Sequence, residues 1–200
     1  MPKHKIAVSG DKGSFSEEAG LFYAKENDLP GELVYATDIN GVLVALNARE
    51  ADLGIFPVAN SRGGIIEHAY EAMGKHNFKY LEQFKMDVEQ CLMSRPEKSE
   101  KDIKKISSHP EAISHCENYL RKQYPNVRLI YWDDTAKAAK DLAEGVLSED
   151  TAVIAPAVCA EQYGLKLLAK GIQDQNPNFL NFIVVQRIGT SLTRLLIIWP

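Results

Sequence analysis

The sequence contains no hydrophobic run long enough to cross a membrane, and its first residues, MPKHKIAVSG, lack the apolar core of a signal peptide. It also lacks a basic stripe. Its 23 lysines and arginines are outnumbered by 27 aspartates and glutamates, which gives a net charge of −4. We therefore expect no membrane insertion and no nucleic-acid partner, and we expect the protein in the cytoplasm.

Cysteine is scarce as well. The sequence has three cysteines, an odd number, and they lack the spacing of a metal site. They are scattered along the chain at Cys91, Cys116 and Cys159. This distribution favours reduced thiols that pack as small hydrophobic side chains over disulfides or metal ligands. No motif for a metal ion or an organic cofactor is present, and we expect neither.

Short β-branched runs alternate along the chain with stretches of helical character. The strand-like runs include KIAVSG, LGIFPV and TAVIAP, and the helix-like stretches include FSEEAGLFYAKEN, PEAISHCENYLRKQY and TAKAAKDLAEGVL. Strands that alternate with helices form βαβ units around mostly parallel sheets. The pattern therefore predicts an α/β fold.

The middle of the chain differs from this pattern. The segment KYLEQFKMDVEQCLMSRP alternates over a long span, which predicts one extended strand that crosses between two lobes. After it, Ser99 and Asp102 have the spacing of a capping box on a short surface helix. We expect residues 1–80 and 178–200 to form lobe 1, residues 97–171 to form lobe 2, and residues 81–96 and 172–177 to cross between them. Two crossings make a hinge, and a hinge places a ligand cleft between the lobes.

Small polar residues gather at four junctions between expected elements. In open α/β folds, ligands bind beyond the carboxyl ends of strands, where the N-termini of the following helices attract anions. Each junction taken singly is explained by helix capping alone. Four in one chain make a shared cleft for a small anion an equally good explanation. The junctions are Ser14-Phe15-Ser16, Asn60-Ser61, Ser108-His109-Pro110-Glu111 and Asp134-Thr135.

The histidines show no pairing pattern along the sequence. We interpret His109 as a packed or capping residue, and the other four as surface or core residues. Those four are His4, His68, His76 and His115.

At the four junctions the sequence resembles the catalytic domain of prephenate dehydratase, in order, from Ile6 to about Val185. The family pattern Gly-x-x-Gly-[Thr/Ser]-Phe-Ser is matched by GDKGSFS, and Ala-Glu-x-Tyr-Gly-Leu by AEQYGL. Pro-x-Glu-Asn-Ser-x-x-Gly is matched by PVANSRGG, with Ala59 for the glutamate. Ser-His-Pro-Gln-Ala appears as SHPEA, with Glu111 for the glutamine, and Ser-Thr-Ala-x-Ala-Ala as DTAKAA, with Asp134 for the serine.

The resemblance implies two lobes like those of type II periplasmic binding proteins, with the active site in the cleft between them. It implies conversion of prephenate, a small anionic substrate, to phenylpyruvate in phenylalanine biosynthesis, and it implies a homodimer. Many members carry a C-terminal ACT domain that senses phenylalanine. The chain reaches Pro200 soon after the expected return strand, so we expect no regulation of that kind.

One family motif is altered. The Thr-Arg-Phe motif of the return strand falls on Leu180, Asn181 and Phe182 when it is counted from GIQDQNPN. The resemblance assigns proton donation to the threonine and substrate anchoring to the arginine, and both are replaced. A similar Thr-Arg pair, Thr193 and Arg194, occurs downstream. We interpret it as coincidence, since it would restore the chemistry only if the end strand entered the cleft.

The matched positions define a predicted site. Glu111 is the predicted replacement for the missing acid, if burial raises its pKa, and Thr135 or Ser61 acting through water is the alternative. Arg62 and Arg187 are possible carboxylate anchors, although both also fit a surface position. The residues predicted to bind the substrate are Ser14, Phe15, Asn60, Ser61, Ser108, Thr135, Asn181 and Phe182.

Three functions are open at this point. The first is a prephenate dehydratase with a rearranged site. The second is a prephenate decarboxylase that does not aromatise the ring, which suits the loss of the acid. The third is an inactive protein that binds a small anion on the same scaffold.

Overall fold

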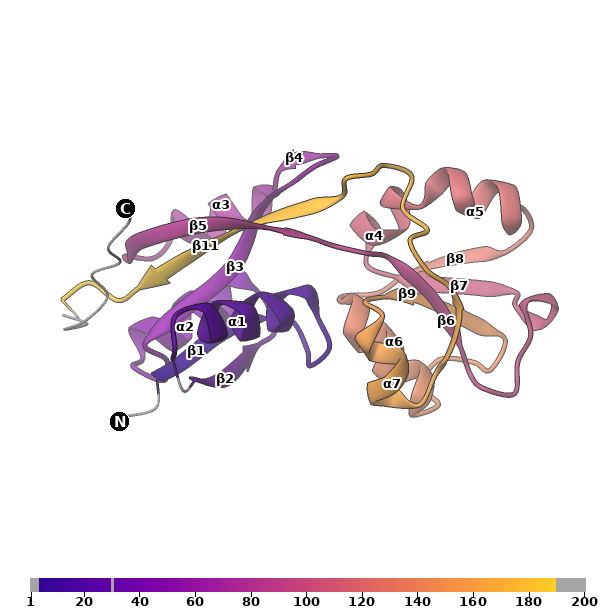
Figure 1. The fold of residues 1–200 in the computed structure, drawn as a ribbon, viewed down its shortest axis with the longest axis horizontal. Coiled ribbons are helices and arrows are strands. Elements are labelled where there is room, and N and C mark those ends of the chain that lie inside the picture. Colours follow the sequence, from indigo (N-terminus) through magenta and orange to yellow (C-terminus); the bar gives the residue numbers. More distant parts are fainter. Residues whose placement is uncertain (1–3, 30, 190–200) are drawn as a thin grey trace.

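The computed structural model describes residues 4–29 and 31–189, and these form two lobes that each surround their own sheet (Figure 1). Two segments of chain connect the lobes. This confirms the expected α/β fold with two lobes. Thr193 and Arg194 lie outside the described residues.

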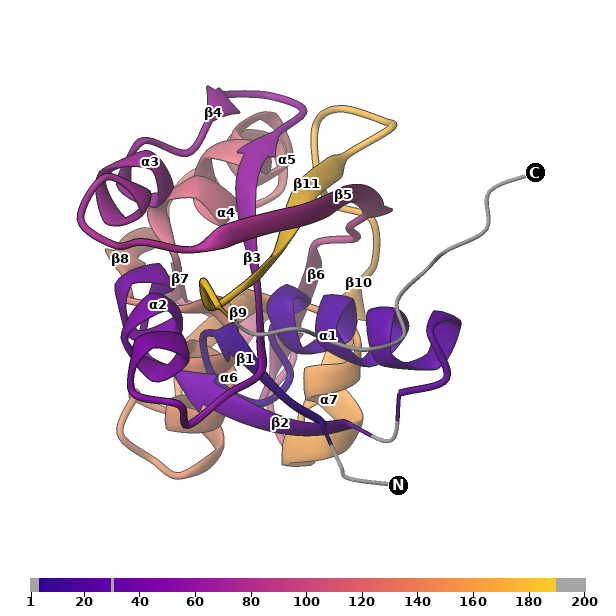
Figure 2. The same cartoon turned by 90° about the vertical axis from the view of Figure 1, so that its left-hand side faces the viewer.

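Lobe 1 is built around a sheet with the strand order β2-β1-β3-β11-β5, and a short strand, β4, pairs with β3. The first three strands of this order are parallel, whereas β11 is antiparallel to both of its neighbours. Figure 2 shows α1 on one face of the sheet and α2 and α3 on the other. The elements are β1 (His4–Ser9), α1 (Phe15–Glu26), β2 (Gly31–Ala36), α2 (Ile39–Asn47), β3 (Leu53–Asn60), β4 (Gly64–Ile65), α3 (Glu67–Met73), β5 (Lys79–Asp87) and β11 (Phe179–Gln186).

Both faces of the lobe 1 sheet are covered, so its central strands are buried on both sides. Successive side chains of a strand point to opposite faces, and β3 illustrates the result. Ile55 packs with α1, whereas Phe56 packs with α2 and α3, and both are fully buried. The sheet therefore holds the N-termini of α1 and α2 in fixed positions at one edge.

Lobe 2 has a sheet with the strand order β10-β6-β9-β7-β8. No strand was expected from the sequence at LKLLAK. The structure nevertheless has a strand there, β10, which pairs antiparallel with β6. The elements are β6 (Cys91–Ser94), the 3-10 helix η1 (Glu100–Asp102), β7 (Lys105–Ser108), α4 (Pro110–His115), α5 (Glu117–Gln123), β8 (Arg128–Tyr131), α6 (Thr135–Ala143), β9 (Thr151–Ala155), α7 (Val158–Tyr163) and β10 (Lys166–Ala169).

The segment expected as one long crossing strand is divided between the two sheets. Its first part is β5 of lobe 1, its last part is β6 of lobe 2, and only residues 88–90 lie between them. The second crossing runs beside the first. Val88 N donates to Asn178 O at 2.8 Å, and Ile172 N donates to Gln90 O at 3.0 Å. The two crossings are thus hydrogen-bonded to each other and form a paired hinge.

The stretch expected as a single helix at residues 110–124 is broken at Cys116, which separates α4 from α5. The break has a tertiary cause. Asp174 of the second crossing accepts hydrogen bonds from the backbone N–H groups of Asn118 at 3.0 Å and Tyr119 at 3.2 Å. A carboxylate at this point caps a new helix and replaces the partners that a continuous helix would have supplied.

Several helix starts follow the expected capping chemistry. Ser14 Oγ accepts from Glu17 N at 3.2 Å at the start of α1. The Glu17 carboxylate accepts from Gly13 N at 2.6 Å, one residue earlier than a standard capping box requires. The capping box of Ser99 and Asp102 is confirmed, although it begins a 3-10 turn. Among the described residues, no helix has the length and apolar character of a membrane span.

Candidate active site

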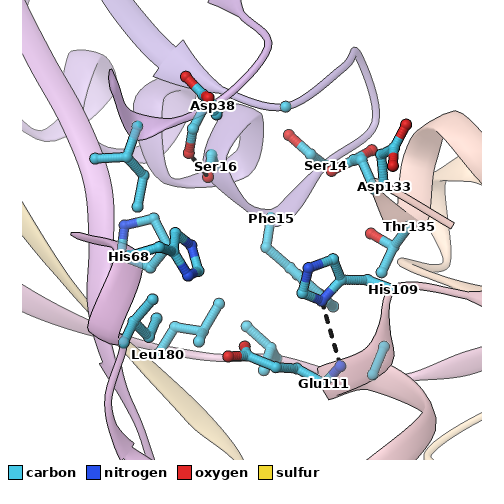
Figure 3. Close-up of a pocket in the computed structure, with 18 of the residues that line it drawn as sticks. Ser14, Phe15, Ser16, Asp38, His68, His109, Glu111, Asp133, Thr135 and Leu180 are labelled. Atoms are coloured by element: carbon cyan, nitrogen blue, oxygen red, sulfur yellow. Dashed lines mark hydrogen bonds between the residues drawn. The ribbon is translucent and has the colours of Figure 1, made fainter. Parts of the chain in front are cut away.

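A cleft of about 190 Å³ lies between the lobes and is lined from both sides (Figure 3). Lobe 1 contributes the ends of β1 and β2 and the starts of α1 and α2, while lobe 2 contributes the starts of α4 and α6. The hinge closes one side with Val88 and Gln90. This is where parallel strands end and helices begin, the position at which α/β folds bind ligands.

The lobe 1 wall comes from two helix starts. Ser14, Phe15 and Ser16 line the cleft at the N-terminus of α1, and Ser16 Oγ lies 3.1 Å from Ser9 Oγ. Asp38 is the N-cap of α2, and its Oδ1 accepts from a backbone N–H at 2.7 Å. The structure therefore places Ser14 and Phe15, two of the predicted substrate-binding residues, in the lining of the cleft.

The lobe 2 wall has the same construction. Pro110 is the first residue of α4, and His109 Nδ1 accepts from Glu111 N at 3.3 Å. Asp134 caps α6 by accepting from the backbone N–H of Lys137 at 2.8 Å. Thr135 is the first residue of α6, and its side chain lines the cleft.

Glu111 and Leu180 come from different lobes and meet at the same end of the cleft. Figure 3 shows Glu111 reaching from α4 toward the side of the cleft formed by Leu180 and His68. Leu180 occupies the position of the family's threonine on β11. The apolar side chain lines the cleft where a hydroxyl is expected, and a carboxyl group from the other lobe faces the same space.

Two histidines that were interpreted as surface or core residues also belong to the cleft. His68 and His115 both line the cleft, although no sequence signal assigned them to it. His115 is 7% exposed, and its Nδ1 is buried without a hydrogen-bond partner among the described residues. Burial lowers the pKa of His115. Its position four residues after Glu111 places both side chains on one face of α4, a signal that sequence reasoning could have used.

The predicted pair Asn60 and Ser61 lies beside the cleft and does not line it. β3 leads into a turn and β4 at this point, so no helix start is formed. Asn60 Oδ1 accepts from the backbone of Arg62 at 3.0 Å, and Ser61 Oγ donates to Asn178 Oδ1 at 3.2 Å. Asn60 lines an adjoining pocket that also contains Arg62, Glu111 and His115.

Three other predicted binding residues are also absent from the lining. Ser108 Oγ donates to Ile154 O at 2.6 Å inside lobe 2. Phe182 is fully buried in lobe 1, where its ring stacks on Phe84 with 5.7 Å between centroids. Asn181, the replacement for the family's arginine, lies on β11 outside the cleft lining.

The charge of the lining is acidic. Among the described residues, the cleft lining contains no lysine or arginine, and its basic side chains are three histidines. Arg62 lies in the adjoining pocket, and Arg187 follows the end of β11 that is remote from Leu180. Burial raises the pKa of the Asp134 carboxyl. The acidic side chains of the lining are Asp38, Glu111, Asp133 and Asp134.

No metal-binding group of histidine, cysteine and carboxylate side chains is found within residues 4–29 and 31–189. The three cysteines are buried free thiols, as expected. Burial raises the pKa of both Cys116 and Cys159 to about 12. These thiols are therefore protonated at neutral pH, which agrees with a packing role.

Comparison with known proteins identifies the fold and the family. Arogenate dehydratase 1 of Petunia hybrida is 33% identical over 184 residues, which cover 92% of this chain and 42% of the relative. Arogenate dehydratase/prephenate dehydratase 6, chloroplastic, of Arabidopsis thaliana is also 33% identical, with 92% and 43% covered. The crystal structure of prephenate dehydratase from Arthrobacter aurescens in complex with L-Phe matches with a TM-score of 0.82 and 28% identity, over 95% of this chain and 62% of that one.

The chain spans less than half the length of these curated relatives. The model of the prephenate dehydratase family matches residues 6–189, which include both lobes and the cleft. The chain therefore belongs to the prephenate dehydratase family.

Proposed function

We propose that the chain converts prephenate to phenylpyruvate with loss of water and carbon dioxide, a step of phenylalanine biosynthesis. The observation that carries this proposal is the position of Glu111. A carboxyl group from lobe 2 faces the cleft wall where Leu180 has replaced the family's proton donor. The family match over both lobes supports the same reaction.

The reaction needs a proton at one position. The bond from C4 of the ring to its hydroxyl oxygen breaks, and the oxygen leaves with the electron pair and takes a proton to become water. The bond from C1 to its carboxylate breaks at the other end of the ring, and its electrons complete the aromatic ring as carbon dioxide leaves. Since hydroxide is a poor leaving group, a positioned acid contributes about 100-fold or more to the rate.

Of the three predicted proton donors, Glu111 is the best placed to protonate the leaving hydroxyl group. Ser61 lies outside the cleft lining and is held by hydrogen bonds to Asn178 and Phe179. Thr135 lines the cleft, but at the start of α6. Glu111 approaches Leu180 from the opposite lobe, so closure of the lobes brings its carboxyl group toward the hydroxyl of a bound substrate.

Two further features belong to this proposal. The family resemblance supports a homodimer, and the three scattered free cysteines support a location in the cytoplasm. The substrate is a small anion, and the hydroxyl groups of Ser14 and Ser16 at the start of α1 line the cleft, where they can donate to one carboxylate.

The test follows two products from one incubation. Purified protein is mixed with prephenate, and phenylpyruvate absorbance and carbon dioxide release are measured together. We expect both products in equal amounts. Glu111→Ala should lower kcat about 100-fold or more while the dissociation constant for prephenate changes by less than about threefold. Glu144→Ala, which removes an exposed carboxylate at the end of α6, is the matched control.

Each alternative function has its own outcome. An unchanged kcat in Glu111→Ala removes the assignment of the acid. Carbon dioxide without an aromatic product indicates a decarboxylase, the second candidate, which the apolar Leu180 favours because no hydroxyl donates at that position. No product of either kind indicates a binding protein.

A further inference from the structure

The AEQYGL segment, residues 160–165, matches its family pattern in full, yet none of its residues lines the cleft. It forms the last turn of α7 and the turn that follows the helix. The proposed reaction assigns no role to it. Any role in the function of the cleft must therefore act through contacts that the segment makes elsewhere.

Two residues of the segment fix the end of α7 within lobe 2. Gly164 follows the helix with φ of 66°, the left-handed conformation that glycine adopts at helix ends. The backbone N–H of Leu165 donates to Ala160 O at 2.8 Å, and the leucine side chain is buried in the core of lobe 2. Tyr163, the last residue of the helix, packs partly against the same core. Its ring therefore has a defined position on lobe 2.

Tyr163 makes a hydrogen bond to the other lobe. Its hydroxyl donates to Lys12 O at 2.6 Å. Lys12 belongs to the loop of residues 10–13 between β1 and α1, which we call the Gly13 loop. Figure 1 shows this side of lobe 1 facing α6 and α7. Burial raises the pKa of Tyr163 to about 12, so the hydroxyl keeps its proton at neutral pH and acts as the donor.

The Gly13 loop also packs closely against lobe 2 beside this bond. The Cys159 thiol donates to Gly13 O at 3.3 Å. Gly13 is buried, and a Cβ added there would lie 2.8 Å from Sγ of Cys159 and 3.7 Å from the Cβ of Ala136 in α6. The loop of lobe 1 is therefore in direct contact with α7, with no room for a side chain between them.

Lobe 1 holds the same loop through Glu17. The Glu17 carboxylate accepts from Gly13 N at 2.6 Å and also from the hydroxyl of Tyr35 in β2. The N–H group of Gly13 thus bonds to lobe 1, whereas the carbonyl oxygens of Lys12 and Gly13 bond to lobe 2. The Gly13 loop is therefore held from both lobes at once.

The Gly13 loop continues directly into the wall of the cleft. Ser14, Phe15 and Ser16 are the next residues of the chain, and all three line the cleft. Ser14 also caps α1, so a displacement of the loop moves the start of this helix. A displacement of about 1 Å in a group that positions a substrate can lower the rate about 100-fold. The position of the loop is therefore relevant to binding in the cleft.

We propose that Tyr163 is a positioning residue for the cleft, because its hydroxyl holds the Gly13 loop against α7 and thereby keeps the Ser14 side of the cleft opposite the wall formed by lobe 2. The AEQYGL motif then has a function as a unit. Tyr163 makes the contact, while Gly164 and Leu165 fix the helix end from which it is made. This inference goes beyond the proposed reaction, since it applies to any ligand that contacts both walls.

The size of the effect follows from where the bond is made. Its donor and its acceptor lie on different lobes, so the bond is lost when the lobes move apart at this point. An interaction made in one arrangement and lost in another raises the population of the first. A ligand that contacts both walls binds to that arrangement. Loss of the bond should therefore weaken binding by about two- to tenfold, the net effect of one neutral hydrogen bond.

The experiment compares Tyr163→Phe with the unmodified protein. This change removes the hydroxyl and keeps the ring, so the packing against the core of lobe 2 is retained. We expect KM for prephenate to rise about two- to tenfold, while kcat changes less than about twofold, because the bound substrate itself holds the two walls. Tyr131→Phe is the matched control. Tyr131 is 66% exposed, belongs to the same lobe and does not line the cleft, so its KM should not change.

Amide hydrogen exchange measures the loop directly. The N–H group of Gly13 should exchange about two- to tenfold faster in Tyr163→Phe, because the loop is less often covered by α7. Amides of the buried strand β9 should keep their rates in both variants. In Tyr131→Phe the rate at Gly13 should equal that of the unmodified protein.

Kinetics decide the inference when prephenate is converted. It is overturned if KM in Tyr163→Phe equals that of the unmodified protein, and a loss of unfolding free energy without a change in KM would show a structural role alone. Failure of the proposed function has a different result. If prephenate is not converted, exchange at Gly13 decides instead. Faster exchange in Tyr163→Phe but not in Tyr131→Phe would uphold the inference, and equal rates would overturn it.

Discussion

Arg62 of lobe 1 reaches the second crossing, and its Nη1 lies 3.7 Å from Oδ2 of Asp174. Its Nη2 lies 3.6 Å from Oε2 of Glu117 at the start of α5. Asp174 also accepts from the backbone of Asn118 at 3.0 Å. Arg62 therefore links the β3–β4 turn of lobe 1 to lobe 2 at the rim of the cleft.

Arg62→Ala should raise KM about two- to fivefold, because partly exposed ion pairs contribute about 0.2–1 kcal/mol. The effect should diminish at high salt, which screens the pairs in the unmodified protein. Arg121→Ala is the matched control, since it breaks the 2.6 Å pair with the same Glu117 within α5 and does not link the lobes. Steady-state kinetics at low and high salt measure both. An unchanged KM in Arg62→Ala would show that the contact does not hold the lobes.

Gly13→Ala should disturb a second contact between the lobes, the one between the Gly13 loop and α7. Gly13 has φ of 90°, and a Cβ there would lie 2.8 Å from Sγ of Cys159 in α7. Gly164 also has a positive φ, 66°, but has open space around it. Both alanine variants should lose about 1–2 kcal/mol of unfolding free energy from the left-handed backbone. Only Gly13→Ala should also raise KM, because the clash displaces the start of α1.

Urea unfolding and steady-state kinetics of the two glycine variants separate the contributions. Equal KM values in Gly13→Ala and Gly164→Ala would mean that the contact between the Gly13 loop and α7 has no influence on the cleft.

Leu180→Thr should restore the family hydroxyl to the cleft wall. Leu180 packs against both core clusters of lobe 1, so the change should cost about 1–3 kcal/mol of stability. In the Glu111→Ala background it should raise kcat, because a hydroxyl then faces the space that Glu111 left. Leu180→Val, which shortens the side chain without adding a donor, is the control. If the threonine and valine variants have the same kcat in this background, proton donation from position 180 is excluded.

Features set by neighbouring residues could be predicted from the sequence. The alternation of strand and helix patterns gives the α/β class, because the period of burial differs between the two elements. Ser14 and Pro110 mark helix starts, since a cap depends on residues one to three positions away. The lining of the cleft by Ser14, Phe15, Glu111 and Thr135 follows from the same local positions.

Features set by distant residues could not be predicted. The break of the 110–124 helix at Cys116 depends on Asp174, more than fifty positions away along the chain. Asn60 and Ser61 look like a helix start, but Gly64 with φ of 76° directs the chain into a hairpin. β10 contains mostly leucine, lysine and alanine, which favour helix, and its pairing with β6 overrides that preference.

The pH dependence of stability provides a test of His115. Burial lowers its pKa in the folded protein, so the unfolded chain, with a pKa near 6.5, binds more protons between the two values. The unfolding free energy is then fully retained above about pH 6.5, and it falls as the pH decreases toward the lowered pKa of the folded state. The slope for one proton approaches about 1.4 kcal/mol per pH unit.

His115→Asn should reduce this slope by the contribution of one proton, while the unmodified protein loses stability as the pH falls below about 6.5. Urea unfolding at a series of pH values measures the difference. Asparagine keeps a polar group at the buried position and does not titrate, so the comparison isolates the proton from the packing. Parallel curves for the two proteins over this range would show that His115 has the same proton affinity folded and unfolded.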